Sequence, residues 1–429
     1  MAISSNLIPL IEKRVAELPV PAALELPNGQ RIGASAPRLR LKFSQWPTLS
    51  ALAAAQVGAV AEAYVEGQAE IQGSMRDLMA IAVAVLPSDL SANNMSWWAR
   101  IAREAWSRGT HTLNKDAQQI QFHYDVSDAF YAMWLDPRRA YSCAYYRAPD
   151  MTLAQAQEAK LDHICRKLML KRGERFLDIG SGWGALLLWA AEHYGVAATG
   201  ITLSKNQHAY VSQLIEQRGL KERVRLLLCD YRELPPDQLF DKIASVGMLE
   251  HVGSANMLAY YRKIHALLVP GGMVLNHAIT SGRLNDKELS GGMGAFIEKY
   301  IFPGGELLHV SHLLRETAAA GLEMVDTENL RPHYARTLWA WSDALEAQLD
   351  QALEVLTRTS GDAARAQRIL RAYRLYLAGS AMSFERGWNA LHQMLAIKPD
   401  GRMDSGVLRA AQSPYPFTRD YMYAGNKGD

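Results

Sequence analysis

The stretch Arg175-Phe176-Leu177-Asp178-Ile179-Gly180-Ser181-Gly182-Trp183-Gly184 is an apolar run that leads directly into three alternate glycines. Residues 175–179 have the composition of a buried strand, and residues 185–194 have the amphipathic pattern of a helix that Gly195 would end. Glycines between a strand and a helix let the backbone turn sharply and approach a ligand closely. The stretch therefore predicts a loop suited to a nucleotide or nucleoside, although dehydrogenases, methyltransferases and plain tight turns share this pattern.

Strand-like and helix-like runs alternate after this loop. Strands are expected at residues 196–201, 224–228, 242–246 and 272–277, and a helix at residues 203–219. This alternation, sustained over about 100 residues, is typical of parallel sheets with crossover helices. We predict an α/β fold with a doubly wound, Rossmann-like domain. Helices are expected further on, at residues 344–357 and 363–378.

The first 90 residues differ in character from the rest of the chain. Alternating polar and apolar residues at 38–43 predict a strand, and residues 63–73 predict a strand pair with a glycine-containing turn. Residues 49–60 and 75–86 are expected to be helical. We predict a small α+β domain over residues 1–90, a linker and connecting helix over 91–120, the α/β domain over 121–400 and a C-terminal tail over 401–429.

The composition argues against several classes of protein. A formal net charge of +2 in 429 residues gives no reason to expect nucleic acid binding, although local basic patches would permit contact with an anionic membrane surface. Three cysteines without a Cys-x-x-Cys pattern predict neither a disulfide framework nor a zinc or other metal site, and they fit a reducing compartment. Residues 1–21 contain charged side chains that a signal-peptide core lacks, and the most apolar run, 78–86, is about half as long as a membrane span. We expect a cytoplasmic protein whose membrane contact is peripheral.

The second expected strand of the α/β domain ends without an acidic residue. Many nucleoside-binding sheets place Asp or Glu there to bind the ribose hydroxyls. Here Thr202, Ser204 and Gln207 follow the strand instead. These three side chains would have to supply the polar contacts.

Six short motifs follow one another across residues 120–400. They are His123-Tyr124-Asp125-Val126-Ser127, Tyr141-Ser142-Cys143-Ala144-Tyr145, residues 177–184, residues 202–207, Val246-Gly247-Met248-Leu249-Glu250-His251-Val252-Gly253 and Lys299-Tyr300-Ile301-Phe302-Pro303-Gly304-Gly305. In order and spacing they resemble the cyclopropane-fatty-acyl-phospholipid synthase family, which includes the mycolic acid cyclopropane synthases. The N-terminal region, with residues 67–73, is similar to the lipid-binding domain that precedes catalysis in bacterial synthases.

The resemblance implies a class I methyltransferase fold that binds S-adenosylmethionine beyond the strand ends. It also implies that Trp183 shields the adenosyl group from water, the alternative being a core aromatic residue at the start of a helix. The matching cofactor positions are Tyr141, Ser142, Asp178, Gly180, Ser181, Gly182, Trp183, Gly184, Thr202, Ser204, Gln207, Tyr231 and Arg232.

The implied reaction transfers a methylene group from S-adenosylmethionine to the cis double bond of a membrane phospholipid acyl chain. An isolated alkene is a weak nucleophile, so the protein must position it in a dry slot. Aromatic faces can stabilise the resulting cation, and Tyr145, Tyr300 and Trp341 are candidates. Ring closure requires a base, which the resemblance identifies as bicarbonate. The positions that match its binding cluster are Cys143, Glu250, His277, the backbone of Ile279, and Tyr334.

Each member of this cluster has a structural alternative. Cys143 alone is typical of a small buried hydrophobic residue, and His277 of a satisfied core histidine. Glu250 would serve to cap a helix, and Tyr334 would simply be a buried tyrosine. Their joint presence at the family's positions favours the catalytic interpretation.

The sequence departs from the family at Ser181 and Ser380, where many members have cysteine, and across residues 286–294. Three other functions stay open. The cation could lose a different proton and give a methylated unsaturated chain, or be reduced after that loss and give a methyl-branched chain. The protein could bind lipid without turnover, or methylate a soluble molecule. The resemblance further implies a homodimer at the inner face of the membrane.

Overall fold

The structure is a computed structural model that describes residues 4–54, 56–86, 126–284, 293–301, 306–400, 415–416 and 418–423. It divides into two compact units. The first, here called the small-sheet unit, comprises Met1–Ser96, Lys287–Pro303 and Leu338–Ser383. The second, the large-sheet unit, comprises Trp97–Asp286, Gly304–Thr337 and Phe384–Asp429.

These units differ from the predicted domains, because residues 287–303 and 338–383 group with the N-terminal region rather than with the α/β domain. Side-chain contacts explain the grouping. Arg371 donates hydrogen bonds to the carbonyl of Tyr64 at 2.8 Å and to the carboxylate of Glu70 at 2.5 Å. Partners 307 positions apart leave no local signal in a sequence. The predicted linker over 91–120 lies outside the described residues, as does most of the predicted tail.

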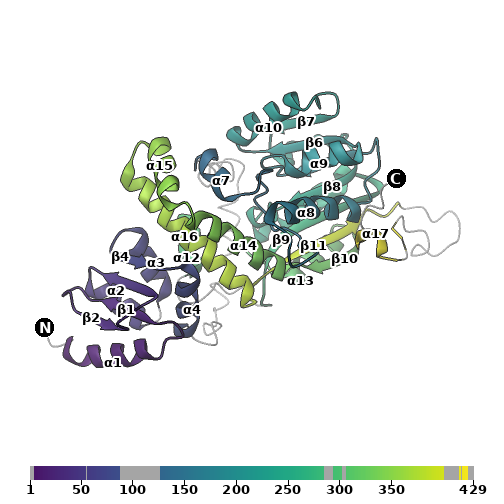
Figure 1. The fold of residues 1–429 in the computed structure, drawn as a ribbon. Coiled ribbons are helices and arrows are strands. Elements are labelled where there is room, and N and C mark those ends of the chain that lie inside the picture. The colour runs from purple at the N-terminus through teal and green to yellow at the C-terminus, as the bar shows by residue number, and fades with distance from the viewer. Residues whose placement is uncertain are drawn as a thin grey trace. The chain divides into compact units, whose positions relative to one another are not determined.

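The small-sheet unit contains a four-stranded sheet in the order β2-β1-β3-β4 (Figure 1). Its strands are β1 (Ala22–Glu25), β2 (Arg31–Gly33), β3 (Leu39–Phe43) and β4 (Ala69–Gln72). Its N-terminal helices are α1 (Ser4–Ala16), α2 (Trp46–Ala53), α3 (Val57–Val65) and α4 (Met75–Val85). Its later helices are α12 (Met293–Tyr300), α15 (Leu349–Ser360) and most of α16 (Ala363–Glu385).

The strand predicted at 38–43 and the helix predicted at 75–86 are confirmed. The strand pair predicted at 63–73 is wrong, because Ala63, Tyr64 and Val65 end helix α3 and only β4 is extended. Aromatic and β-branched residues favour strands, but burial of these three side chains in the unit overrides that preference. The helix predicted at 344–357 is wrong in its bounds, because a turn at Ala347 and Gln348 separates α14 (Arg331–Glu346) from α15.

The large-sheet unit contains a seven-stranded sheet in the order β10-β11-β9-β8-β5-β6-β7. Pairs β5–β6, β5–β8, β6–β7 and β8–β9 are parallel, whereas β11 runs antiparallel to β9 and β10. The strands are β5 (Arg175–Ile179), β6 (Ala197–Thr202), β7 (Val224–Leu228), β8 (Phe240–Val246), β9 (Leu268–Ser281), β10 (Glu323–Asn329) and β11 (Asn389–Ile397). The predicted α/β fold is confirmed.

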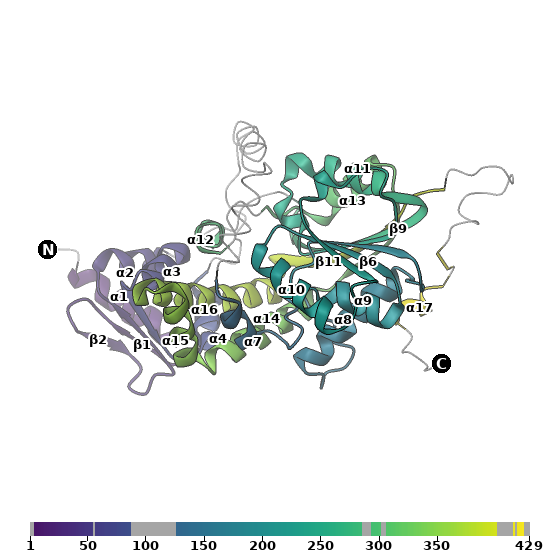
Figure 2. The ribbon, with the colours of Figure 1, turned by 90° about the horizontal axis from the view of Figure 1, so that it is seen from above.

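Helices cover both faces of this sheet. Figure 2 shows α8, α9 and α10 on one face and α11 and α13 on the other. The unit's helices are α7 (Asp128–Trp134), α8 (Leu153–Lys167), α9 (Ala185–Tyr194), α10 (Lys205–Gln217), α11 (Met257–Leu267), α13 (Val310–Ala319), the start of α14, and α17 (Asp420–Tyr423), with short 3₁₀ turns η1 (Tyr231–Glu233), η2 (Leu249–His251) and η3 (Ser254–Asn256). Two buried apolar clusters, one on each face, form the core. Within the described residues, no helix has the length and apolarity to span a membrane.

Candidate active site

The glycine loop joins β5 to α9 as the sequence predicts. Gly180, Gly182 and Gly184 have φ angles of +80°, +53° and +80°, a region that side chains with a Cβ rarely adopt. A Cβ on Gly184 would lie 2.8 Å from a methyl carbon of Val211 on α10. Ser181 completes the turn, since its hydroxyl donates to the carbonyl oxygen of Asp178 at 3.0 Å. The sequence thus fixes a tight loop that presents backbone to the adjoining cavity.

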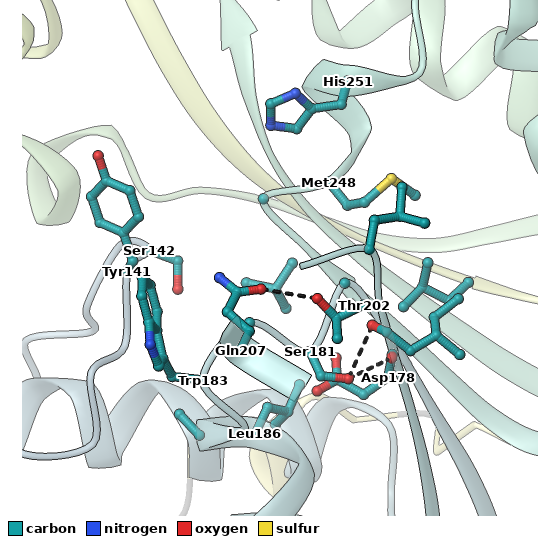
Figure 3. A pocket seen from close by; sticks show the side chains of 18 of the residues that line it. Tyr141, Ser142, Asp178, Ser181, Trp183, Leu186, Thr202, Gln207, Met248 and His251 are labelled. Carbon is teal, nitrogen blue, oxygen red and sulfur yellow. Dashed lines mark hydrogen bonds between the residues drawn. The ribbon is translucent and has the colours of Figure 1, made fainter. Parts of the chain in front are cut away.

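A cavity lies beside this loop, lined by the ends of β5, β6 and β8 and by residues 139–142. In Figure 3, Tyr141, Ser142 and Trp183 lie on one side of it and Met248 and His251 on the other. All predicted cofactor positions except Gly184 and Ser204 line the cavity.

The end of β6 shows how the site manages without an acidic residue. The Thr202 hydroxyl donates to Gln207 Oε1 at 2.9 Å (Figure 3), and Ser204 caps α10 by accepting from the Gln207 backbone. Gln207 Nε2 is buried without a partner. The pair therefore offers an amide donor to a ligand in the cavity.

Asp178, at the end of β5, supplies an acceptor on the same cavity. Its side chain is buried and Oδ2 has no hydrogen-bond partner. Burial raises its pKa to about 7, although the charge of nearby Lys160 opposes that rise. A buried polar atom without a partner is costly, so Asp178 and Gln207 together indicate a polar ligand.

Trp183 fits both interpretations given for it. It lines the cavity, and its ring centroid lies 5.0 Å from that of Tyr131 on α7. Tyr141 packs against both Tyr131 and Trp134, at 5.4 Å in each case. Trp183 is thus a member of a buried aromatic cluster and also a wall of the site.

Glu250 and Ile279 are brought together by a hydrogen bond. Glu250 lies in η2, after β8, and its Oε1 accepts from the Ile279 N–H at 2.6 Å. The backbone of Ile279, a predicted member of the bicarbonate cluster, thus contacts Glu250, another predicted member. Glu250 Oε2 is buried without a partner, and burial raises the pKa of Glu250 to about 7.

His277 lies on β9, two residues before Ile279, and is 1% exposed. Gln393 Nε2 lies 3.2 Å from His277 Nδ1. With this amide as donor, Nδ1 accepts and the ring proton lies on Nε2, which has no partner. Burial lowers the pKa of His277 well below its ordinary value, so the ring is neutral and offers one N–H donor.

Cys143 and Tyr334 are also buried. The Cys143 thiol donates to the carbonyl of Ala144 at 3.2 Å, and burial raises its pKa, so it stays a thiol. Tyr334 lies on α14, with its ring centroid 4.7 Å from that of Phe384. None of the predicted catalytic residues lines the cavity. In the described residues, no hydrogen bond joins Cys143, Glu250 and His277 to one another.

The three aromatic candidates lie in different units. Tyr145, in the large-sheet unit, is stacked between His163 at 4.1 Å and His333 at 4.8 Å. Tyr300 and Trp341 belong to the small-sheet unit, where Tyr300 donates to the Glu66 carboxylate and Trp341 is fully buried.

Lys160, on α8, is a site residue that none of the sequence motifs indicates. This lysine is 2% exposed, lines the cavity, and donates to Ser142 Oγ at 2.8 Å. Next to burial, its positive charge is the largest influence on the pKa of both Cys143 and His277. The sequence does contain one sign of this residue, because a lysine among the apolar positions of an amphipathic helix indicates a buried charge.

Residues 111–394 match the family model described as mycolic acid cyclopropane synthetase. The chain belongs to this family. A probable fatty acid methyltransferase of Pseudomonas putida is 40% identical over 410 residues, covering 95% of this chain and 97% of the relative. Cyclopropane mycolic acid synthase 1 of Mycobacterium tuberculosis H37Rv is 37% identical over 289 residues, covering 65% of this chain and 96% of the relative.

Solved structures agree with the family assignment. Mycolic acid cyclopropane synthase CmaA1, complexed with SAH and CTAB, matches with a TM-score of 0.60 and 35% identity over 66% of this chain and 98% of that one. The cyclopropane synthase MmaA2 from M. tuberculosis matches with a TM-score of 0.60 and 33% identity, covering 66% of this chain and 98% of that one.

The chain is therefore an S-adenosylmethionine-dependent methyltransferase of a lipid-modifying family, and the predicted family and the predicted use of S-adenosylmethionine are confirmed. S-adenosylmethionine supplies an electrophilic methyl group on a sulfonium. The orphan polar atoms of Asp178 and Gln207 and the glycine loop between them fit a ligand with a nucleoside and an amino-acid end. The individual residue roles stay predictions.

Proposed function

We propose that this protein is a cyclopropane-fatty-acyl-phospholipid synthase, which adds a methylene group to the cis double bond of phospholipid acyl chains. The observation that carries this proposal is the buried carboxylate of Glu250. Its Oε1 is held by the Ile279 N–H, and its Oε2 is left without a partner. The neighbouring residues Met248, His251 and Val252 line the cofactor cavity.

The buried polar groups fit the need for a base in an apolar site. Bicarbonate would be held by Glu250 as acceptor and by the neutral Nε2–H of His277 as donor, and it would supply a base there. A small anion needs such partners because it loses its hydration on burial. Cys143 stays a thiol and His277 stays uncharged, so neither side chain places a charge of its own beside the bicarbonate.

Other residues of the chain would exclude water and position the alkene. Trp183 and Tyr141 belong to a continuous aromatic cluster with α7. Such a wall keeps water from a reactive cation and presents aromatic faces to positive charge. Positioning of this kind supplies much of the rate enhancement when the nucleophile is weak.

A phospholipid substrate is supported by the N-terminal region, which precedes the family match at residues 111–394. Methoxy mycolic acid synthase MmaA3 of M. tuberculosis H37Rv matches 68% of this chain over 99% of its own length, so this chain has a large additional segment. The P. putida relative covers 95% of the chain and shares that segment. On the segment, Trp46 is an exposed aromatic residue. Arg31 and Arg38 have side chains 64% and 66% exposed, although they also form ion pairs with Glu25 and Asp77. Exposed aromatic and basic side chains favour peripheral contact with an anionic leaflet.

Lipid mass spectrometry tests the proposal. Purified protein is incubated with S-adenosylmethionine and vesicles of cis-unsaturated phospholipid, with and without bicarbonate. We expect the acyl chain to gain one methylene in a product that resists hydrogenation, with the rate dependent on bicarbonate. A soluble acceptor methylated in preference to the vesicles, or no lipid product at all, would contradict the proposal.

A second candidate gives a methyl-branched or methylated unsaturated chain. The relative that covers nearly the whole chain favours it, because that protein is described as a probable fatty acid methyltransferase. Mass and hydrogenation together separate the products. A cyclopropane chain gains CH2 and keeps its mass on hydrogenation, a methylated alkene gains CH2 and then two hydrogens, and a saturated methyl-branched chain gains CH4.

A further inference from the structure

Lys160 is a buried cation on the wall of the cofactor cavity. It lies on α8 with Gln157, and the two side chains hold the cavity-lining segment 140–142. Gln157 donates to the carbonyls of Ala140 at 3.1 Å and Ser142 at 2.8 Å, and Lys160 donates to Ser142 Oγ at 2.8 Å. An ammonium carries three N–H donors. In the described residues, Lys160 makes this single hydrogen bond and no ion pair.

Asp178 complements Lys160 on the same cavity. Its Oδ2 is buried without a partner, and the charges of the two residues influence each other's pKa. Removing a lone ammonium or carboxylate from water costs several kcal/mol unless a partner compensates it. Asp136 is the charged residue with the largest effect on the pKa of Lys160, ahead of Asp178, but in the described residues no hydrogen bond or ion pair joins it to Lys160. Lys160 and Asp178 therefore both keep hydrogen-bonding capacity for a ligand in the cavity.

We propose that Lys160 binds the carboxylate at the amino-acid end of S-adenosylmethionine, in the cavity where Asp178, already a predicted cofactor position, would bind the ammonium group. Ser142 is then a positioning residue, because it orients the Lys160 ammonium. Nothing in the sequence motifs assigns Lys160, which lies outside all six of them. The inference concerns cofactor binding and stands whatever the lipid acceptor is.

The ionisation of the two groups agrees with this assignment. Burial lowers the pKa of Lys160 to about 8 and raises that of Asp178 to about 7. Both are therefore close to losing their charge when they lack a partner. A bound carboxylate stabilises the lysine cation and a bound ammonium stabilises the aspartate anion.

Arg139 is the competing cation. It also lines the cavity, but its guanidinium lies 4.3 Å from the centre of the Tyr210 ring on α10. Its Nη1 has no hydrogen-bond partner. Arg139 is the alternative holder of the carboxylate and must be distinguished from Lys160 by experiment.

Calorimetric binding with two ligands makes that distinction. One ligand is S-adenosylhomocysteine, and the other is its decarboxylated analogue, 5′-deoxy-5′-(3-aminopropylthio)adenosine. The buffer contains no bicarbonate, so that this anion cannot occupy the site. For Lys160→Met we expect the affinity for S-adenosylhomocysteine to fall about 10- to 100-fold, the range of a lost charged hydrogen bond, and that of the analogue to change less than about 3-fold.

Lys167→Met is the matched control, because Lys167 is a fully buried lysine on the same helix that pairs with Glu328 instead of lining the cavity. We expect it to lower stability without discriminating between the ligands. If Lys160→Met does not fold, Ser142→Ala keeps the charge, removes its only hydrogen bond, and must still weaken S-adenosylhomocysteine more than the analogue. Equal weakening of both ligands by Lys160→Met, or a selective loss in Arg139→Met instead, would overturn the assignment.

Discussion

Replacing Glu250 by glutamine should raise stability at neutral pH while it lowers turnover. Burial raises the pKa of Glu250 from 4.5 to about 7. The folded protein therefore binds a proton that the unfolded chain has released between these values, so wild-type stability falls as pH rises through them. The difference corresponds to at most about 3 kcal/mol. Glutamine does not titrate, and its Oε1 still accepts from the Ile279 N–H.

Urea unfolding of wild type and Glu250→Gln at pH 4 and pH 8 measures this effect. We expect the stability of the variant relative to wild type to rise by up to about 3 kcal/mol between these conditions. Glu222→Gln, at an exposed position, is the control and should show no such trend. A difference that stays constant with pH would refute the reasoning about the buried carboxylate.

The same variant tests the catalytic role of Glu250. We expect cofactor affinity within about 3-fold of wild type and turnover on vesicles lowered by about 10²- to 10³-fold, because a preorganised acceptor is lost without emptying the site. Turnover is measured by lipid mass spectrometry. Wild-type turnover in Glu250→Gln would show that this carboxylate does not serve the reaction.

Three further substitutions test the loop and the core. Gly184→Ala combines a φ of +80° with a Cβ 2.8 Å from Val211, so we expect its free energy of unfolding, measured in urea, to fall by about 2–4 kcal/mol. Gly182→Ala has open space around its Cβ, so we expect a fall of only about 1–2 kcal/mol. Lys167→Met removes the lysine cation from Glu328, leaving His163 Nε2 at 2.8 Å from this carboxylate, and should lose about 3–5 kcal/mol at pH 7. The pKa of Glu328 is lowered to about 2, so the ionised carboxylate stabilises the fold above pH 4.5 and this stabilisation is lost as pH falls toward 2. The loss of stability caused by Lys167→Met should therefore shrink over that interval. Urea unfolding at several pH values measures it.

Local sequence determined the centre of the fold. The strand over 175–179, the loop with its three glycines and the helix over 185–194 lie where the pattern predicts them. Each depends on neighbours within a few positions: strand composition, glycine at positive φ, and helical periodicity. The same applies to Thr202 and Gln207, whose hydrogen bond joins residues five positions apart.

Tertiary structure decided what the sequence could not. The sequence placed residues 338–383 in the α/β domain, but their side chains pack with the N-terminal region. It did not show that the fold brings Glu250, 29 positions away, to accept a hydrogen bond from the Ile279 N–H. It gave no role to Lys160, whose burial and contact with Ser142 arise only when α8 packs on the loop before it. These features depend on which distant groups meet in the dry interior, where partners and charge states are set by burial rather than by neighbouring residues.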